Sequence, residues 1–180
     1  MTLKRQASLA LALALALAAG TAQAAEKTLD KAAMPPKVLE AVAARYPGAN
    51  MTRFEREDED GRTVFEVKVD GPAGPVELEF TPDAALLVEE LTLAAKDLPE
   101  AVTRALAASP YAAAEIQRVE KVIETGKADA PTFELKVQQG ESRHGLIYSA
   151  TGELLKVWER KKHAHPAPAS ATSAPAPATR

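Results

Sequence analysis

Two segments of the chain carry side chains whose types and spacing could bind a metal ion. The first is the acidic run Glu55–Asp60, which is interrupted only by Arg56. Carboxylate oxygens at short spacing are ligands for Ca²⁺, but the run lacks the spaced twelve-residue pattern with a terminal Glu. The sequence therefore favours a solvated hairpin tip, turned by Asp60-Gly61. The same tip could serve as a binding loop for a basic partner.

The second segment holds two of the three histidines. His163 and His165 follow two lysines and could bind copper or nickel weakly. Their place at the start of an Ala-, Pro- and Ser-rich tail favours a polar segment without a metal. The third histidine, His144, is expected to point into the fold, where a structural role is commoner than a ligand role. The sequence therefore predicts no metal ligands and no cofactor.

No arrangement typical of catalysis is present in the sequence. The chain has no Cys, no Ser/His/Asp motif and no glycine-rich phosphate loop. We therefore expect a protein that is not an enzyme, with no catalytic and no cofactor-binding residues.

Trp158 is the single tryptophan of the chain. It stands at the end of the last expected strand, where the first half of the chain has Glu90. A tryptophan here either covers the open end of the sheet as a core residue or serves as an aromatic anchor at an interface.

The middle of the sequence occurs twice, at a constant offset of 68 residues. The matching pairs are Phe65–Val69 with Phe133–Val137, Phe80-Thr81 with Tyr148-Ser149, and Leu86-Leu87 with Leu154-Leu155. A constant offset at three places indicates one supersecondary unit duplicated in tandem. By this offset His144 matches Val76.

Each unit opens with a proline and then apolar residues at helical spacing. In the first unit Val38, Val42 and Tyr46 share one helix face, and in the second Val102 and Leu106 do so. Alternating apolar and polar residues after each helix predict strands. The expected strands are 51–57, 65–69, 76–80 and 86–90 in the first unit, and 116–123, 133–137, 146–148 and 154–158 in the second. The sequence thus predicts an α+β fold of two tandem repeats, each a helix packed on a four-stranded antiparallel sheet.

The ends of the chain differ in character from the repeats. Residues 1–24 have the charged, apolar and small-residue regions of a cleavable signal peptide. The expected order is then a leader over 25–33, a first repeat with its linker over 34–96, a second repeat over 97–160, and a disordered Ala/Pro-rich tail over 161–180. The expected linker within the first repeat is 91–96.

The two units resemble the PepSY-like family, also described as beta-lactamase-inhibitor-like. The resemblance rests on the helix opening Met34–Pro47, echoed by Leu98–Leu106, and on the segment Phe80–Leu87, echoed by Tyr148–Leu155. It implies a tandem fold like that of beta-lactamase inhibitor proteins, in exported proteins. The family has no shared active site, so the resemblance implies no functional residue here.

Charge and export limit the function classes. Cleavage after residue 24 removes two basic residues and no acid, which leaves the mature chain more acidic than the net charge of −3 of the whole. An acidic chain argues against nucleic-acid binding, and no membrane span is expected after cleavage. We expect a periplasmic protein, or alternatively a secreted one, that binds another envelope or secreted protein. It would inhibit or regulate an envelope hydrolase or another envelope protein. The alternative function is a sensor of a small ligand or metal ion.

Overall fold

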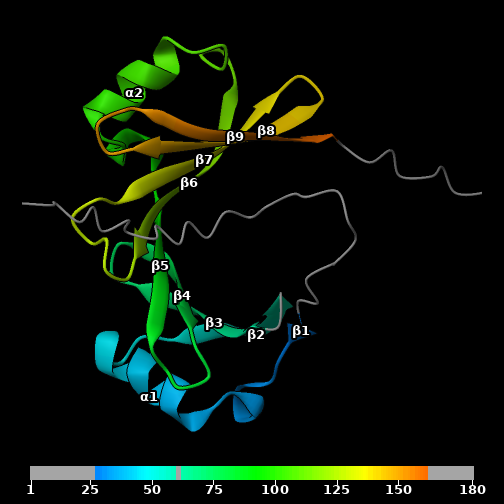
Figure 1. Ribbon diagram of the computed structural model, residues 1–180, viewed down its shortest axis with the longest axis vertical. Helices are drawn as coiled ribbons and strands as arrows, with labels where there is room; N and C mark the ends of the chain where they lie inside the picture. Colours follow the sequence, from blue (N-terminus) through cyan, green and yellow to red (C-terminus); the bar gives the residue numbers. More distant parts are fainter. Residues whose placement is uncertain (1–26, 60–61, 162–180) are drawn as a thin grey trace, which may run out of the picture.

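The strands of the protein form one continuous antiparallel sheet (Figure 1). The computed structural model describes residues 27–59 and 62–161. Within these ranges the sheet has nine strands, which lie side by side in chain order. They are β1 (Lys27–Thr28), β2 (Met51–Glu59), β3 (Arg62–Gly71), β4 (Gly74–Phe80), β5 (Leu86–Leu93), β6 (Glu115–Glu124), β7 (Thr132–Gln139), β8 (Ser142–Ser149) and β9 (Leu154–Lys161).

Two α-helices precede the two sets of strands. Helix α1 (Pro36–Arg45) comes before β2, and helix α2 (Glu100–Ala107) comes before β6. Proline stands at the start of each helix, where its missing N–H has no partner to lose. Short 3-10 turns, Lys31–Ala33 and Ala95–Asp97, lead into both helices. The order of one helix and then four strands therefore occurs twice, as the repeat predicts.

The two halves have separate apolar cores. In the first, Val38 and Val42 of α1 pack with Phe65 and other apolar residues of β2, β3 and β4. In the second, Val102 of α2 packs with Phe133 and its neighbours from β6, β7 and β8. Phe65 and Phe133 are 8% and 5% exposed, so both point under their helices as the strand alternation predicts. Burial of these faces holds each helix on its half of the sheet.

The sheet does not divide into two four-stranded sheets. Strand β5 pairs with β6 from Val88 to Leu93, which joins the halves into one sheet. This pairing extends β5 through the first three residues of the expected linker, so only 94–96 remain outside it. The expected leader also contributes, since β1 pairs with β2 through Lys27 and Thr28.

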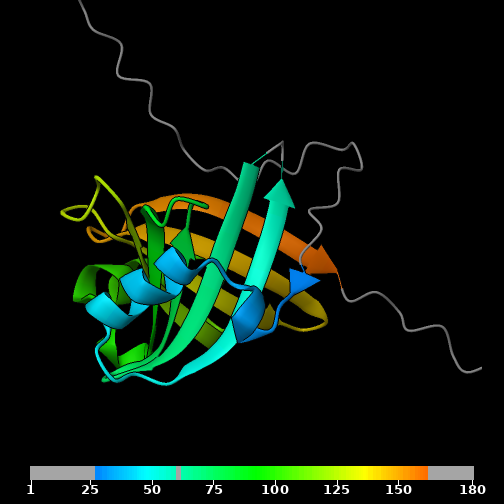
Figure 2. The same cartoon turned by 90° about the horizontal axis from the view of Figure 1, so that it is seen from below.

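The sheet bends so that its two halves face each other. In Figure 1, α1 lies below the first half and α2 above the second, and the face that carries no helix is turned inward on both sides. Figure 2, seen from below, shows the same order of layers, with α1 and the first half in front of the second half. The helices therefore cover the outer face, and the inner face stays free of them.

The predicted signal peptide and the tail from residue 162 onward lie outside the described residues. Both stay predictions, together with the metal interpretation of His163 and His165. No described helix has the length and apolarity needed to cross a membrane.

Candidate functional site

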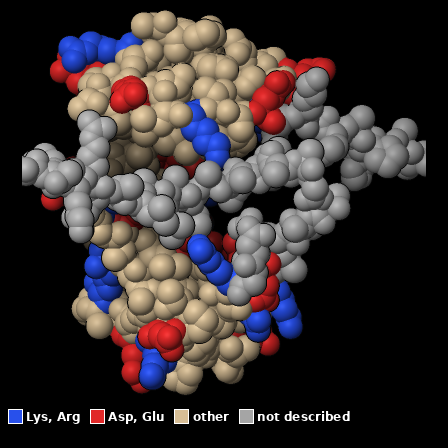
Figure 3. All heavy atoms as spheres, viewed as in Figure 1, with Lys and Arg blue, Asp and Glu red and all other residues tan. Residues whose placement is uncertain are grey.

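The inward, helix-free face of the sheet gathers charged side chains from six neighbouring strands. We call it the hollow face, because the space-filling view shows the surface hollowed between the halves, with Lys and Arg atoms along its borders (Figure 3). Residues paired directly across an antiparallel ladder share a face, and the register therefore defines its members. The acidic members at its centre are Glu55, Glu66, Glu77, Glu79, Glu90, Glu120 and Glu134, and the basic members among them are Arg53, Lys68, Arg118 and Lys136.

Arg118 links the two halves across this face. Its Nη2 atom on β6 lies 2.6 Å from Oε1 of Glu77 on β4, so the side chain reaches over β5. The same nitrogen lies 2.6 Å from Oε1 of Glu120, which is 2% exposed. Lys68 adds a second cation 2.5 Å from Glu77, and Lys136 lies 3.1 Å from Oε2 of Glu120. Hydrogen bonds to charged groups are among the stronger ones, so this network ties β3, β4, β6 and β7 together.

Three other carboxylates on the hollow face have no such partner. Glu66, Glu79 and Glu90 are half-buried and lie on β3, β4 and β5. Among the described residues, none donates a hydrogen bond to them or forms an ion pair with them. Burial, followed by repulsion from nearby carboxylates, raises the pKa of Glu66 to about 8 and those of Glu79 and Glu90 to about 7. Two features of the face thus oppose a negative charge on these groups, namely lost hydration and like charge.

Glu77, which has two cationic partners, differs from the unpaired acids in the direction of its pKa shift. Burial also opposes the charged form of Glu77, but hydrogen bonds from Lys68 and Arg118 outweigh it and lower the pKa of that carboxyl. The pKa of Glu134 is raised, chiefly by burial. Glu66 and Glu134 are therefore not fully solvated, because the bend of the sheet removes part of their water.

One group on this face has the donor atoms for a metal ion. Oxygens of Glu77, Glu90 and Glu120 lie within 4.8 Å of one another. Arg118, however, already binds Glu77 and Glu120 through one nitrogen, and its guanidinium supplies the positive charge that a cation would bring. The group is therefore a neutralised salt-bridge network with Glu90 at its margin.

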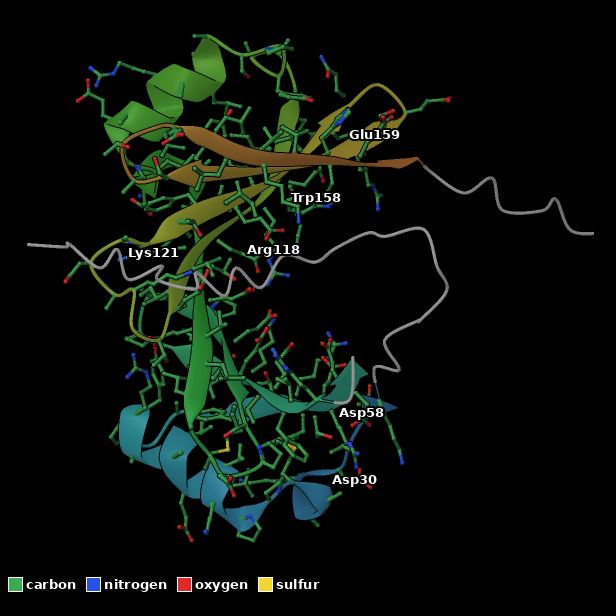
Figure 4. The ribbon with its side chains drawn as sticks, in the orientation of Figure 1. Asp30, Asp58, Arg118, Lys121, Trp158 and Glu159 are labelled. Atoms are coloured by element: carbon green, nitrogen blue, oxygen red, sulfur yellow. The ribbon has the colours of Figure 1, made fainter. Side chains whose placement is uncertain are left out.

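Trp158 borders the hollow face on β9. It pairs with Gly145 of β8, and its indole covers that glycine so closely that a Cβ there would collide with the ring. Figure 4 shows Trp158 and Arg118 directed into the space between the halves, while Glu159 points to the other side. Trp158 is half-buried and belongs to neither core. The interpretation as a core residue is therefore wrong, and its role as an interface anchor stays a prediction.

The acidic run does not assemble into one group. Along β2, Glu55 faces the hollow side opposite Glu66, whereas Arg56 faces the helix side opposite Phe65. Asp58 shares the helix side and pairs with Arg56 at 2.8 Å. The alternation of a strand sends these carboxylates to opposite faces, which prevents a calcium loop from the run. The hairpin is present as predicted, with its turn at 60–61 outside the described residues.

Two polar groups lie on the helix side. Glu89 is 4% exposed, and Arg45 and Tyr46 at the end of α1 both donate hydrogen bonds to it. His144 lies opposite the core residue Val137 and so points to the helix side, into the fold as predicted, with its ring centroid 5.0 Å from that of Tyr111. These contacts join the end of α1, and the turn that follows α2, to the sheet and are structural.

Sequence reasoning offered a sheet face as a binding surface but did not identify the charged groups of the hollow face, although a signal for them exists. Glutamates recur at the polar positions of successive strands, and in a sheet of neighbouring strands these positions fall on one face. Glu66, Glu79 and Glu134 follow this pattern. The partnership of Arg118 with Glu77 has no signal in the sequence, because it depends on how the sheet bends.

A family model matches most of the chain. Residues 21–88 and 73–156 each match the model described as "Putative beta-lactamase-inhibitor-like, PepSY-like". The two matches overlap over residues 73–88, around β4 and β5, and their last residues, 88 and 156, lie 68 residues apart as in the internal repeat. No curated protein matches the sequence.

Solved structures share the fold. A protein from Bacteroides eggerthii described as one of the "putative periplasmic proteins" is 21% identical, with a TM-score of 0.62 over 69% of this chain and 88% of that chain. A DUF2874 family protein from Bacteroides uniformis is 19% identical, with a TM-score of 0.61 over 69% of this chain and 88% of the other. A BLIP-like protein from Bacteroides fragilis is 25% identical, with a TM-score of 0.54 over 71% of this chain and 87% of the other.

Proposed function

Because the chain belongs to the PepSY-like, beta-lactamase-inhibitor-like family, we propose that it is a non-enzymatic binding module for another exported protein. The proposed binding site is the hollow face. The proposed partner presents basic side chains to that face.

The observation that carries this proposal is the set of half-buried carboxylates without partners. Glu66, Glu79 and Glu90 lie on adjacent strands, and their charged forms are opposed by burial and then by repulsion from nearby carboxylates. A lysine or arginine from a partner would relieve both effects at once, and charge-assisted hydrogen bonds to carboxylates are strong and directional. Electrostatic complementarity of this kind gives a complex its specificity and speeds its formation.

Trp158 gives the same face an aromatic border. Tryptophan is enriched among the residues that contribute most to protein complexes. Here it lies half-exposed over Gly145, beside the row that leads to Lys136 and Arg118. A partner that reaches the carboxylates would also cover this ring.

Location follows as part of the proposal. A solved relative is described as one of the "putative periplasmic proteins", and the first 24 residues have the pattern of a signal peptide. We expect the mature protein to begin at or near Ala25, which mass spectrometry of the purified periplasmic form would show. A soluble form that retains Met1 would contradict export.

Site-specific photocrosslinking in living cells tests the binding face. A photoreactive residue replaces Lys136 on the hollow face or, as the control, Lys37 on the exposed side of α1. We expect a discrete crosslinked protein from position 136 and none from position 37. Equal capture from both positions, or capture only from position 37, would place the site elsewhere.

The captured protein then tests the role of the carboxylates. Calorimetry compares the parent with Glu66→Gln/Glu79→Gln, and with Glu100→Gln on the exposed side of α2 as the matched control. Loss of buried charge pairs costs a complex about 2–5 kcal/mol, so binding should weaken at least roughly tenfold in the double variant only. Equal affinities would remove the carboxylates from the site. Heat evolved on titration with Ca²⁺, Cu²⁺ or Zn²⁺ instead would favour the alternative function of a metal sensor.

A further inference from the structure

The outer edge of β9 is an open edge of the sheet. Strand β9 is the last in the strand order, and no described strand pairs with its far side. It is eight residues long, and the backbone N–H and C=O groups of every second residue face outward along it. Open edges of this length are templates for pairing with another strand.

The apolar exposure of the protein is concentrated on the same strand. Leu154, Leu155 and Val157 are 40%, 50% and 41% exposed, and within 27–59 and 62–161 these are the large apolar side chains with high exposure. Contiguous exposed apolar surface of this kind marks an interaction site more often than scattered single residues do.

The internal repeat shows what covers an edge of this type. By the 68-residue offset, β9 corresponds to β5, and Val157 corresponds to Glu89. In the first half the edge of β5 is covered by an antiparallel strand, β6, over its residues 88–93. The position that matches Val157 is also buried there, under Arg45 and Tyr46 of α1. Among the residues that the structure describes, the second half has neither cover, although its strand is built on the same pattern.

The other edge of the sheet is covered over the middle of β2. Strand β1 pairs with β2 through Lys27 and Thr28, and the N–H of Leu29 donates to the C=O of Phe54. A second copy therefore cannot offer the full length of β2 to β9 in the way that β6 is offered to β5. Two copies can instead pair through their β9 strands. The result is a closed dimer, because the same edge of each copy is used and neither stays available to a third copy.

We propose that the protein forms a twofold symmetric dimer through antiparallel pairing of β9 with β9 of a second copy, centred on Val157. The pairing continues the sheet across the dimer and sets Val157 of the two copies side by side. On the hollow side it places Lys156 opposite Trp158 of the other copy, a combination of cation and aromatic ring that is favourable. The two hollow faces then lie on the same side of one longer sheet. The dimer does not depend on the function proposed for that face.

The oligomeric state of the purified mature chain tests this proposal. Sedimentation over a range of concentrations should show a dimer that dissociates on dilution. Charged residues on an edge oppose pairing. The double variant Leu155→Lys/Val157→Lys should therefore remain monomeric, with roughly half the mass of the parent dimer. The matched control Ala112→Lys/Ala113→Lys, in the exposed loop after α2, adds the same charge away from β9 and should stay dimeric. The circular dichroism spectrum checks that each variant is folded.

A single cysteine tests the register directly, because the chain has no cysteine of its own. Val157→Cys should give a covalent dimer with a short bismaleimide, and Ala113→Cys should not. A parent chain that stays monomeric at its highest soluble concentration overturns the proposal. A dimer that persists in the lysine variant, or that does not crosslink through Val157→Cys, overturns it as well, and the crosslink decides alone if the lysine variant fails to fold.

Discussion

Ala84 and Gly152 occupy the same turn position in the two repeats, and both have a positive φ, 66° and 87°. This region is open to glycine but costs other residues about 1–2 kcal/mol. Ala84→Gly should therefore stabilise the protein by about 0.5–1 kcal/mol, since relief of the strain exceeds the entropy that glycine adds to the unfolded chain.

The reverse change, Gly152→Ala, serves as the counterpart. A Cβ at Gly152 would lie 2.5 Å from the carbonyl oxygen of Ala101 in α2, so this variant should lose about 2 kcal/mol or more. Urea unfolding of both variants measures the two effects. Destabilisation by Ala84→Gly would mean that this turn is not strained.

The unpaired carboxylates make the free energy of unfolding fall as the pH rises, which is opposite to the effect of carboxylates that gain a cationic partner on folding. Glu66 and Glu79 titrate near 4.5 when unfolded but hold their protons to about pH 8 and about pH 7 in the fold. Between these values the folded state binds more protons, so the free energy of unfolding falls as the pH rises. Their contribution is complete below about pH 4.5 and is lost by about pH 8.

Glu66→Gln/Glu79→Gln should remove most of this fall, because glutamine mimics the protonated form. After a discount for solvent screening, we expect a gain of about 1–2 kcal/mol at pH 8 and little change at pH 5. Melting temperatures at pH 5 to 9 measure it, with Glu100→Gln following the parent. Parallel curves for the parent and the double variant would show that these groups are not perturbed.

At the scale of the element, the side chains on the two faces of β3 and β7 differ in how much they contribute to stability. Phe65 and Phe133 fill the cores under α1 and α2, and truncation of a buried Phe to Ala typically costs about 3–5 kcal/mol. Glu66→Ala and Glu134→Ala, on the hollow face, should each cost less than about 1 kcal/mol. Chemical denaturation of the four variants checks the order, and costs of similar size on the two faces would contradict it.

The elements also show which parts of the fold can be predicted from the sequence and which cannot. Alternation in β3 and β7 and the helical spacing of Val38 and Val42 depend on local geometry, and both predictions are confirmed. The two residues of β1 carry no such pattern, and their strand exists only because β2 offers its edge. Arg118 meets Glu77 across an intervening strand, so their contact is a property of the bent sheet and cannot be read from either segment.

At the scale of the whole molecule, the tail stays a prediction of the sequence. Segments rich in Ala, Pro and Ser bury too little apolar area to offset the entropy of ordering. Deletion of residues 162–180 should therefore leave the melting temperature nearly unchanged, while removal of β9 as well should lower it strongly, because β9 covers the edge of β8. Differential scanning calorimetry compares the two truncations, and a large drop with the shorter deletion would show that the tail packs on the fold.

The strand order of the sheet also determines the order in which its hairpins can form during folding. Each strand pairs with the strand that follows it in the chain, so every hairpin can close as soon as its second strand has been made. Proteins built from such neighbouring contacts fold quickly, since little loop entropy must be lost before a contact forms. The first half can complete its core before the second half is synthesised, and β6 then finds the edge of β5 already in place. Among the described strands β9 is the last to be made, and its outer edge pairs with no described strand.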